Sequence, residues 1–299
     1  MPMSFHWFEL LSGLASCVFC ALLAAVCLRA KLRALLERAP ERASGPSAAT
    51  DSIAQAAPKN HTQVSRLAAS LAACAALAAF LAMPLGSLPA LFPLSWGGLA
   101  ALGCLILASG FAEDWSWNSA MRRKARVLAL LGLALALFAW YARQRGVPGE
   151  LLSLDTYVAM PLAELMDWRG RIGIALLALA FLCAIRDVQQ DLPSGLTQVV
   201  RMEASEARIT VIAALARQIW ILAALGMALC LFVPFCPAGW LGLSGVTGLA
   251  ADALIFWLKV LIADHALWLA TDSFPRASPW LPWAQILLAG LGALCILFT

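Results

Sequence analysis

The sequence predicts an all-α integral membrane protein that crosses the bilayer about eight times, with both termini on the non-cytoplasmic side. Two observations support this fold class: the composition is very apolar, and the apolar residues gather in segments of membrane-spanning length. Of the 299 residues, 62% are hydrophobic and only 13% are charged, whereas a soluble domain is about half apolar. The formal net charge of +4 is small and widely spread, so it does not indicate binding to nucleic acid.

Eight apolar segments come close to the length of about 20 residues that a helix needs to cross the hydrocarbon core. They lie at residues 8–28, 67–86, 92–112, 125–142, 170–186, 209–235, 251–271 and 280–298. The fourth and fifth are the shortest, and the fifth could instead begin nearer Leu162 as a tilted or half-buried element. All eight belong to one transmembrane domain that covers residues 1–299.

The basic residues indicate the orientation of these segments. The loops after the first, third, fifth and seventh segments hold 15 Lys and Arg residues, whereas the loops on the opposite side hold four. Loops rich in Lys and Arg stay in the cytoplasm, so both termini are expected outside it. The N-terminus agrees, because no Lys or Arg precedes the first apolar segment, which is the reverse of a cleaved signal peptide.

Three connecting segments differ in composition. Residues 38–64 are rich in Ala, Ser and Pro without an apolar period, which predicts a flexible cytoplasmic linker. Residues 187–208 mix charges with a Leu-Pro-Ser-Gly turn and predict a more ordered cytoplasmic loop. Residues 146–169 predict an external interfacial helix. Its apolar side would consist of Leu162, Leu165 and Trp168.

The seventh apolar segment carries ionisable residues, which are costly to bury in a bilayer and often mark an ion path. Asp252 and Lys259 are seven residues apart and share a helix face, whereas Lys259 and Asp264 point away from each other. Lys259 lies near the middle of its segment, too deep to extend easily to an interface. The candidates for a proton or charge relay are Lys259, Asp264, Asp252, His265, Asp272 and, in the sixth segment, Arg217. The alternative is a set of static ion pairs between helices.

The cysteines and histidines do not predict a metal or haem site. Seven of the nine cysteines fall within or at the ends of apolar segments, where Cys packs as a small apolar residue. Neither a second Cys-x-x-Cys pair nor a nearby His accompanies Cys17 and Cys20, so a tetrahedral metal site is not expected. Cys230 and Cys236, near the external face, could pair as a disulfide. Only His265 lies at membrane depth, which is too few for bis-histidine haem ligation.

Two segments resemble a known family of membrane subunits. They are SEARITVIAALARQIWILAALGMALCLFVPF at residues 205–235 and LIFWLKVLIADHALWLATDSFPR at residues 254–276. Together with the expected spans and termini, they resemble the membrane subunit shared by formate hydrogenlyase (subunit 4), hydrogenase-4 (component C) and respiratory NADH:quinone oxidoreductase. Lys259 falls on the family's membrane lysine, and the Phe-Pro-Arg at residues 274–276 is similar to its basic motif after the seventh span. The likeness in sequence pattern covers about residues 205–298.

The resemblance implies a coupling subunit without a catalytic centre, in the cytoplasmic (inner) membrane of a bacterium or archaeon. Its partners would be antiporter-like membrane subunits and a peripheral hydrogenase-like arm, whose iron–sulfur or NiFe centres lie outside this chain. No cofactor is expected on this chain alone. Quinone binding stays open, because this chain has no acid in residues 121–126, where the family carries a Ser-Arg-Glu segment and a further Glu. The implied contacts to the peripheral arm are Asp187, Asp191, Glu203, Glu206 and Arg276.

Two other functions fit the same sequence. One is a structural scaffold that keeps the fold without relaying ions, which the missing acids near the fourth span favour. The other is a stand-alone transporter or channel for a small solute or ion, which the Asp, Lys and His residues of the seventh segment would serve equally well. Membrane lipid is an expected partner under every one of these functions.

Overall fold

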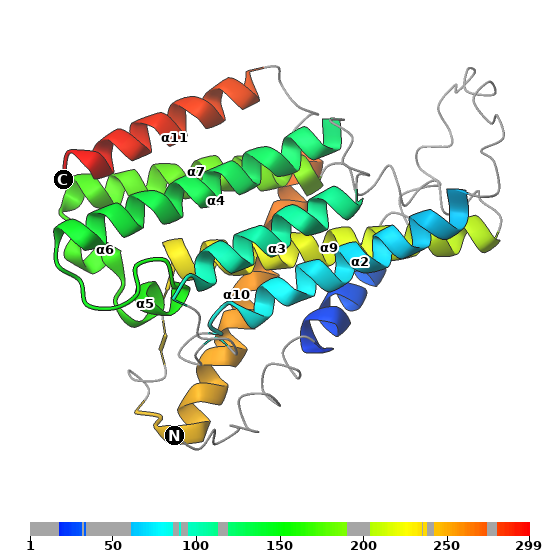
Figure 1. Ribbon diagram of the computed structural model, residues 1–299, viewed down its shortest axis with the longest axis horizontal. Coiled ribbons are helices and arrows are strands. Elements are labelled where there is room, and N and C mark those ends of the chain that lie inside the picture. Colours follow the sequence, from blue (N-terminus) through cyan, green and yellow to red (C-terminus); the bar gives the residue numbers. More distant parts are fainter. Residues whose placement is uncertain are drawn as a thin grey trace.

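A computed structural model shows that the regular structure of the described residues is helical throughout (Figure 1). The structure describes residues 18–31, 33, 61–85, 90, 95–112, 119–189, 204–234, 236–237, 242–273 and 280–299. The helices are a stretch over residues 18–31, α2 (His61–Leu81), α3 (Gly97–Ala112), α4 (Ser119–Gln144), α5 (Leu154–Ala159), α6 (Leu162–Leu165), α7 (Trp168–Gln189), α9 (Ala204–Phe232), α10 (Gly245–Ser273) and α11 (Leu281–Leu297).

Four of the described helices are long and apolar enough to cross a membrane. Their spanning portions are Ala120–Gln144, Trp168–Gln189, Val211–Phe232 and Gly245–Ala270. Shorter apolar stretches occupy Leu67–Leu81, Gly97–Ala112 and Leu281–Leu297. Each of these helices overlaps one of the apolar segments predicted from the sequence. The chain is therefore an all-α membrane protein, as its composition predicts.

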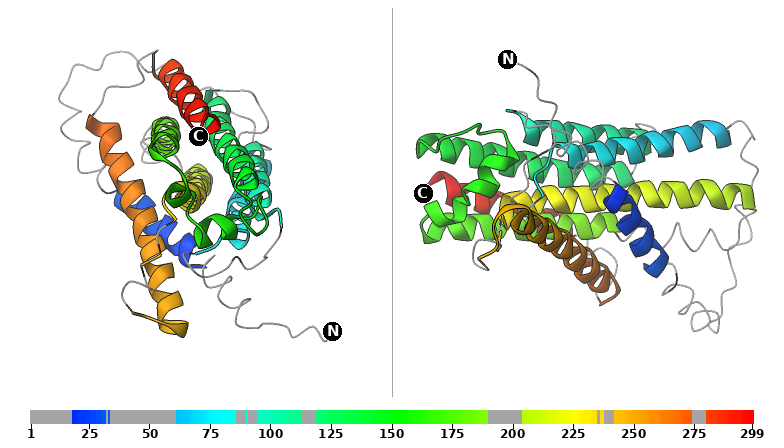
Figure 2. Two further views of the ribbon diagram at one scale, coloured as in Figure 1. Left: turned by 90° about the vertical axis from the view of Figure 1, so that its left-hand side faces the viewer. Right: turned by 90° about the horizontal axis from the view of Figure 1, so that it is seen from below.

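Consecutive long helices run in opposite directions along the bundle. We call the end at which α7 reaches Gln189 and α11 begins at Leu281 the polar end. α2, α4 and α9 also begin there (Figure 1). We call the opposite end, which α5 and α6 cover, the capped end. α10 and the N-terminal stretch over residues 18–31 differ from the other helices because both are steeply inclined to them (Figure 2, right).

α9 lies at the centre of the bundle, and the other helices surround it (Figure 2, left). Residues 219–225 are buried without interruption, which occurs only when every face of a helix is covered. In the apolar 18-residue stretch of each helix, 78% of α9 is buried inside the protein but only 28% of α10. The outward row on α10 is apolar, with Leu254 66% exposed and Ile262 60% exposed. α10 is therefore a peripheral helix with one face on the bundle and one face directed away from it.

α7 and α11 pack with their backbones in contact at two glycines. A Cβ atom on Gly173 would lie 2.8 Å from the carbonyl oxygen of Gly292, and one on Gly292 would lie 2.8 Å from that of Gly173. Small residues at such a crossing allow the dense packing that holds membrane helices together. Gly290, two residues from Gly292 on the same helix, has open space where its Cβ atom would be.

The connection at 146–169 differs from the predicted single interfacial helix. It forms the two short helices α5 and α6, with Pro161 at the start of the second. Proline lacks a backbone N–H and cannot continue a preceding helix, so the chain turns there. Of the predicted apolar side, Leu162 is buried, whereas Leu165 and Trp168 are exposed.

Polar contacts hold this connection over the capped end. The backbone N–H of Ala90 donates to Asp155 Oδ1 at 3.0 Å, and that of Gly98 donates to the Leu152 carbonyl at 2.8 Å. The Tyr157 hydroxyl donates to the Leu151 carbonyl. Burial raises the pKa of the Tyr157 phenol, so it remains a neutral donor. These contacts tie the connection to Ala90 and to the start of α3, and α5 packs against α9.

The loop predicted at 187–208 is shorter than expected. α7 continues to Gln189 and α9 begins at Ala204, so Asp187 belongs to a helix and is only 4% exposed. Charged residues end an apolar segment in the sequence, but they do not end a helix whose last turn is covered by its neighbours. The linker predicted at 38–64 lies outside the described residues, except that α2 has already begun at His61.

We expect Gly292→Ala to lower the unfolding temperature in mild detergent, because its methyl group would push two backbones apart at a cost of about 1–3 kcal/mol. Gly290→Ala is the matched control and should be neutral or slightly stabilising, because Ala is the better helix former. Thermal unfolding followed by tryptophan fluorescence measures both variants. Equal unfolding temperatures for the two would contradict the close crossing of α7 and α11.

Candidate functional site

A buried ion pair joins the N-terminal helical stretch to α10. Lys31 Nζ lies 2.9 Å from Asp264 Oδ2 and 3.0 Å from Asp264 Oδ1. The side chains are only 5% and 2% exposed. Lys259, which the sequence predicts to point away from Asp264, is therefore not the cation that pairs with it. The pair instead joins two helices through residues that are 233 positions apart in the sequence.

Two glutamine side chains complete this site from α7 and α9. Gln218 accepts a hydrogen bond from Lys31 Nζ at 3.0 Å and donates one to Asp264 Oδ2 at 3.2 Å. Gln189 donates to Asp264 Oδ1 at 2.7 Å. Both amides are buried. We call these four residues the Lys31–Asp264 cluster, and it ties together the N-terminal stretch, α7, α9 and α10.

The glutamines explain how the bundle tolerates two opposite charges. Taking each ion out of water costs several kcal/mol, and the attraction between the ions offsets this only when hydrogen bonds also satisfy their remaining polar atoms. Each carboxylate oxygen of Asp264 has two donors, one from Lys31 and one from a glutamine. The cluster therefore supports an ionised pair. Removing one member leaves polar atoms of the others without a hydrogen bond.

A second polar cluster lies between α4, α7 and α11. Arg126 Nη1 is 3.4 Å from Asp187 Oδ2 and donates to Gln285 Oε1 at 2.9 Å. Gln285 Nε2 in turn donates to Asp187 Oδ2 at 3.0 Å. Asp187 is buried, whereas Arg126 is 30% exposed and reaches toward the surface. We call these three residues the Asp187 cluster, and it closes the polar end on the side of α11.

The last turn of α7 belongs to both clusters. Asp187 and Gln189 are two residues apart, about 200° around the helix, so they serve opposite sides of it. Within the described part of the chain, each has a buried acceptor atom without a hydrogen-bond partner, Asp187 Oδ1 and Gln189 Oε1. Buried acceptors of this kind usually bind ordered water. A movement of this single turn would disturb both clusters at once.

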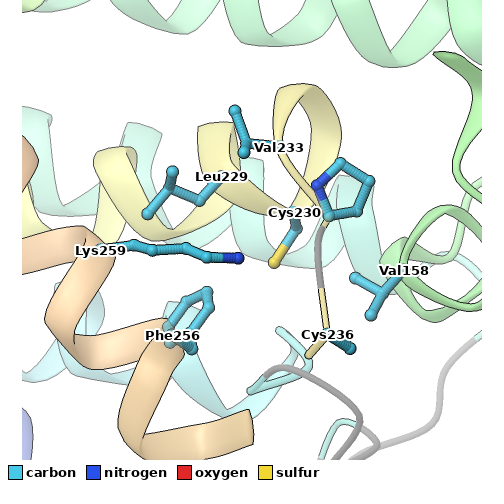
Figure 3. A pocket seen from close by; sticks show the side chains of 8 residues that line it. Val158, Leu229, Cys230, Val233, Cys236, Phe256 and Lys259 are labelled. Atoms are coloured by element: carbon cyan, nitrogen blue, oxygen red, sulfur yellow. The ribbon is translucent and has the colours of Figure 1, made fainter. Parts of the chain in front are cut away.

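Lys259 lies toward the capped end, apart from both clusters. Its side chain extends past Phe256, and its amine points toward the Cys230 thiol on α9 (Figure 3). A small hollow in front of the amine is also lined by Cys236. The inclined α10 brings this residue close to the loop that follows α9.

The remaining predicted relay residues have different surroundings. His265 lies on the exposed face of α10, where its ring stacks on Trp268 at 6.2 Å between ring centroids. Asp252 is buried, and Arg217 is partly buried. The predicted side chains that fall outside the described part of the structure are those of Asp191, Glu203, Glu206, Asp272 and Arg276.

The cysteines of the hollow are not joined. Cys230 and Cys236 are free thiols, so the disulfide that the sequence left open is not formed. Cys230 is 2% exposed, and its thiol donates to the Pro84 carbonyl at 3.5 Å. Among the described residues, no group of three or more His, Cys, Asp or Glu side chains is placed to hold a metal ion.

Sequence patterns do not single out five members of the two clusters: Lys31, Arg126, Gln189, Gln218 and Gln285. Lys31 falls beyond the apolar segment that ends at residue 28 and counts there as one of the cytoplasmic positive charges. The helix nevertheless continues and buries it. The signal for the glutamines is an amide in or beside an apolar segment, because amides at membrane depth hydrogen-bond across helices.

No protein-family model matches this chain, and comparison with curated proteins also gives no match. The fold and the site therefore define the class of protein. It is an α-helical membrane protein with several candidate spans, two buried polar clusters at one end of its bundle, and a lysine-lined hollow toward the other.

We expect Gln218→Leu to lower the free energy of unfolding by about 3–6 kcal/mol, because Lys31 and Asp264 would each lose a hydrogen bond worth about 1.5–3 kcal/mol. Gln144→Leu, at the exposed end of α4, is the matched control and should have little effect. Denaturant or thermal unfolding in mild detergent measures both. If Gln218→Leu is as stable as the control, the glutamine does not support the ion pair.

Proposed function

We propose that this chain is the membrane anchor and coupling subunit of a hydrogenase-like or complex I-like respiratory complex. In this role it has no redox centre of its own. It holds a peripheral electron-transfer module at the polar end and contacts proton- or cation-translocating, antiporter-like subunits within the membrane. The chain would cross the cytoplasmic membrane of a bacterium or archaeon eight times, with the polar end in the cytoplasm and both termini outside.

The observation that carries this proposal is the Lys31–Asp264 cluster. Ionisable groups inside a membrane bundle are costly and are usually retained for ion movement or charge coupling. This pair lies at the polar end, where the positive-inside rule places the cytoplasm. It also shares the last turn of α7 with the Asp187 cluster. A protein docked on that end would therefore have one helical turn through which to influence a buried charge pair.

The geometry supports a specific order of events. A redox change in the peripheral module displaces the last turn of α7, and Gln189 then loosens its hydrogen bond to Asp264 Oδ1. Asp264 then has one donor fewer to support its buried charge. Its pairing with Lys31 is weakened, and the two side chains can separate. Lys259 is five residues away along α10, about 7.5 Å along the axis, so it responds to the changed pairing of Asp264.

The outer faces of α10 and α11 support the presence of partner membrane subunits. On α11, Leu287 is 65% exposed and Leu291 is 54% exposed, and the row on α10 that contains Leu254 and Ile262 is similarly exposed. A lipid bilayer accepts such faces, and so does another membrane helix. His265 lies on the exposed face of α10, and a polar ring there is better accommodated by protein than by lipid.

Lys259→Ala should leave assembly of the complex intact and uncouple redox turnover from ion translocation, with translocation reduced at least about tenfold. Asp264→Asn should uncouple in the same way, because it keeps the shape of the side chain but not its charge. Glu164→Gln, at an exposed position in α6, is the control. Redox-driven acidification of membrane vesicles measures translocation. Normal pumping by Lys259→Ala would show that the lysine is structural.

Two other functions are tested by isolation of the protein from native membranes in mild detergent. A coupling subunit should co-purify with iron–sulfur proteins and antiporter-like subunits. A stand-alone transporter should be isolated alone or as a homo-oligomer. A scaffold should co-purify with the same partners as a coupling subunit but show unchanged ion translocation when Lys259 and Asp264 are neutralised. The buried clusters favour coupling over a scaffold, because apolar side chains would hold the helices together equally well.

A further inference from the structure

The hollow beside Lys259 combines a cationic amine with two thiols in otherwise apolar surroundings. The amine and the Cys230 thiol point toward one another across it (Figure 3). Phe256 and Leu229 form apolar walls, and Cys236 lines the hollow from the loop after α9. The centre of a water molecule can occupy about 10 Å³ of it. That is roughly enough for one water.

The rim of the hollow is open, whereas its inner wall is closed. Val233 on the rim is 50% exposed and Cys230 on the inner wall is 2% exposed. Lys259 and Cys236 are both partly exposed. The Lys259 stem lies along apolar side chains while its amine is directed toward this opening, as long basic side chains do near membrane interfaces. The amine is thus within reach of water from the capped end.

The charges around Cys236 show that its thiol shares the surroundings of the amine. Burial is the largest cause that raises the pKa of the Cys236 thiol. The Asp252 carboxylate raises this pKa further, and the Lys259 ammonium lowers it. The acidic and basic residues that act on the thiols of the hollow are Asp252 and Lys259 from α10 and Asp155 from α5.

We propose that the hollow is the port through which Lys259 exchanges its proton with the aqueous phase at the capped end. The Lys259 ammonium transfers one proton to a water in the hollow, and the amine keeps the electron pair of the broken N–H bond. The water passes a proton past Cys236 to bulk solvent. In the reverse direction, the neutral amine accepts a proton from this water. This inference rests on the proposed coupling function and adds to it the side on which the relay opens.

Cys236 provides a native reporter for this port. Right-side-out and inside-out vesicles containing the assembled protein are treated with a membrane-impermeant maleimide, and the modified peptide is quantified by mass spectrometry. Cys236 should be modified from the non-cytoplasmic side and not from the cytoplasmic side. Cys236→Ser identifies the peptide, and the buried Cys230 thiol should stay unmodified.

The charge of Lys259 should control the rate of this modification. In Lys259→Met the Cys236 thiol loses a nearby cation, so less thiolate forms at pH 7.5 and labelling should slow by about threefold or more. Lys259→Arg keeps a cation and should restore most of the rate. Absence of labelling, labelling from the cytoplasmic side, or equal rates in Lys259→Met and the unmodified protein would each overturn the proposal.

These results are independent of the test of coupling. If the coupling function fails but the port exists, labelling and its dependence on Lys259 persist while redox-driven ion movement is absent or insensitive to Lys259. If the port fails but coupling holds, ion movement still depends on Lys259 while Cys236 is not labelled from the non-cytoplasmic side.

Discussion

The burial of Lys31 against Asp264 is the constraint on which the arrangement of this bundle depends. An ion pair without water is stable only with full hydrogen bonding and good geometry, and that requirement fixes the positions of four helical elements together. Gln218 must come from the central helix α9, and Gln189 must come from the last turn of α7. The apolar residues set which faces are inside, whereas this cluster sets the register between the helices at the polar end.

The charges of α10 have different surroundings along one helix. Asp264 faces the bundle at the polar end and is paired, whereas Lys259 faces a small hollow toward the capped end. The two residues are five apart, about 7.5 Å along the helix axis and about 140° around it, so they point into different parts of the bundle. This separation gives each group its own environment, as the proposed charge-coupling role requires.

The sequence predicted most of the helices and part of the site, for identifiable physical reasons. Apolar segments predicted α2, α3, α4, α7, α9, α10 and α11, because spanning length and hydropathy are local properties. Asp264, Lys259 and Asp252 stood out because charges in apolar segments are rare. Lys31 and Gln189 could not be placed, because their burial depends on neighbours from distant parts of the chain. The tilt of α10 and the turn at Pro161 likewise follow from packing and not from hydropathy.

A double-mutant cycle on Lys31 and Asp264 tests the central claim most directly. The free energy of unfolding in mild detergent is measured for the unmodified protein, Lys31→Met, Asp264→Leu and the double variant. Each single change leaves one buried charge without its partner and should cost about 3–5 kcal/mol. The double variant should be more stable than the sum predicts by at least about 1.5 kcal/mol. Effects that add to within about 0.5 kcal/mol would show that the two charges do not hold these helices together.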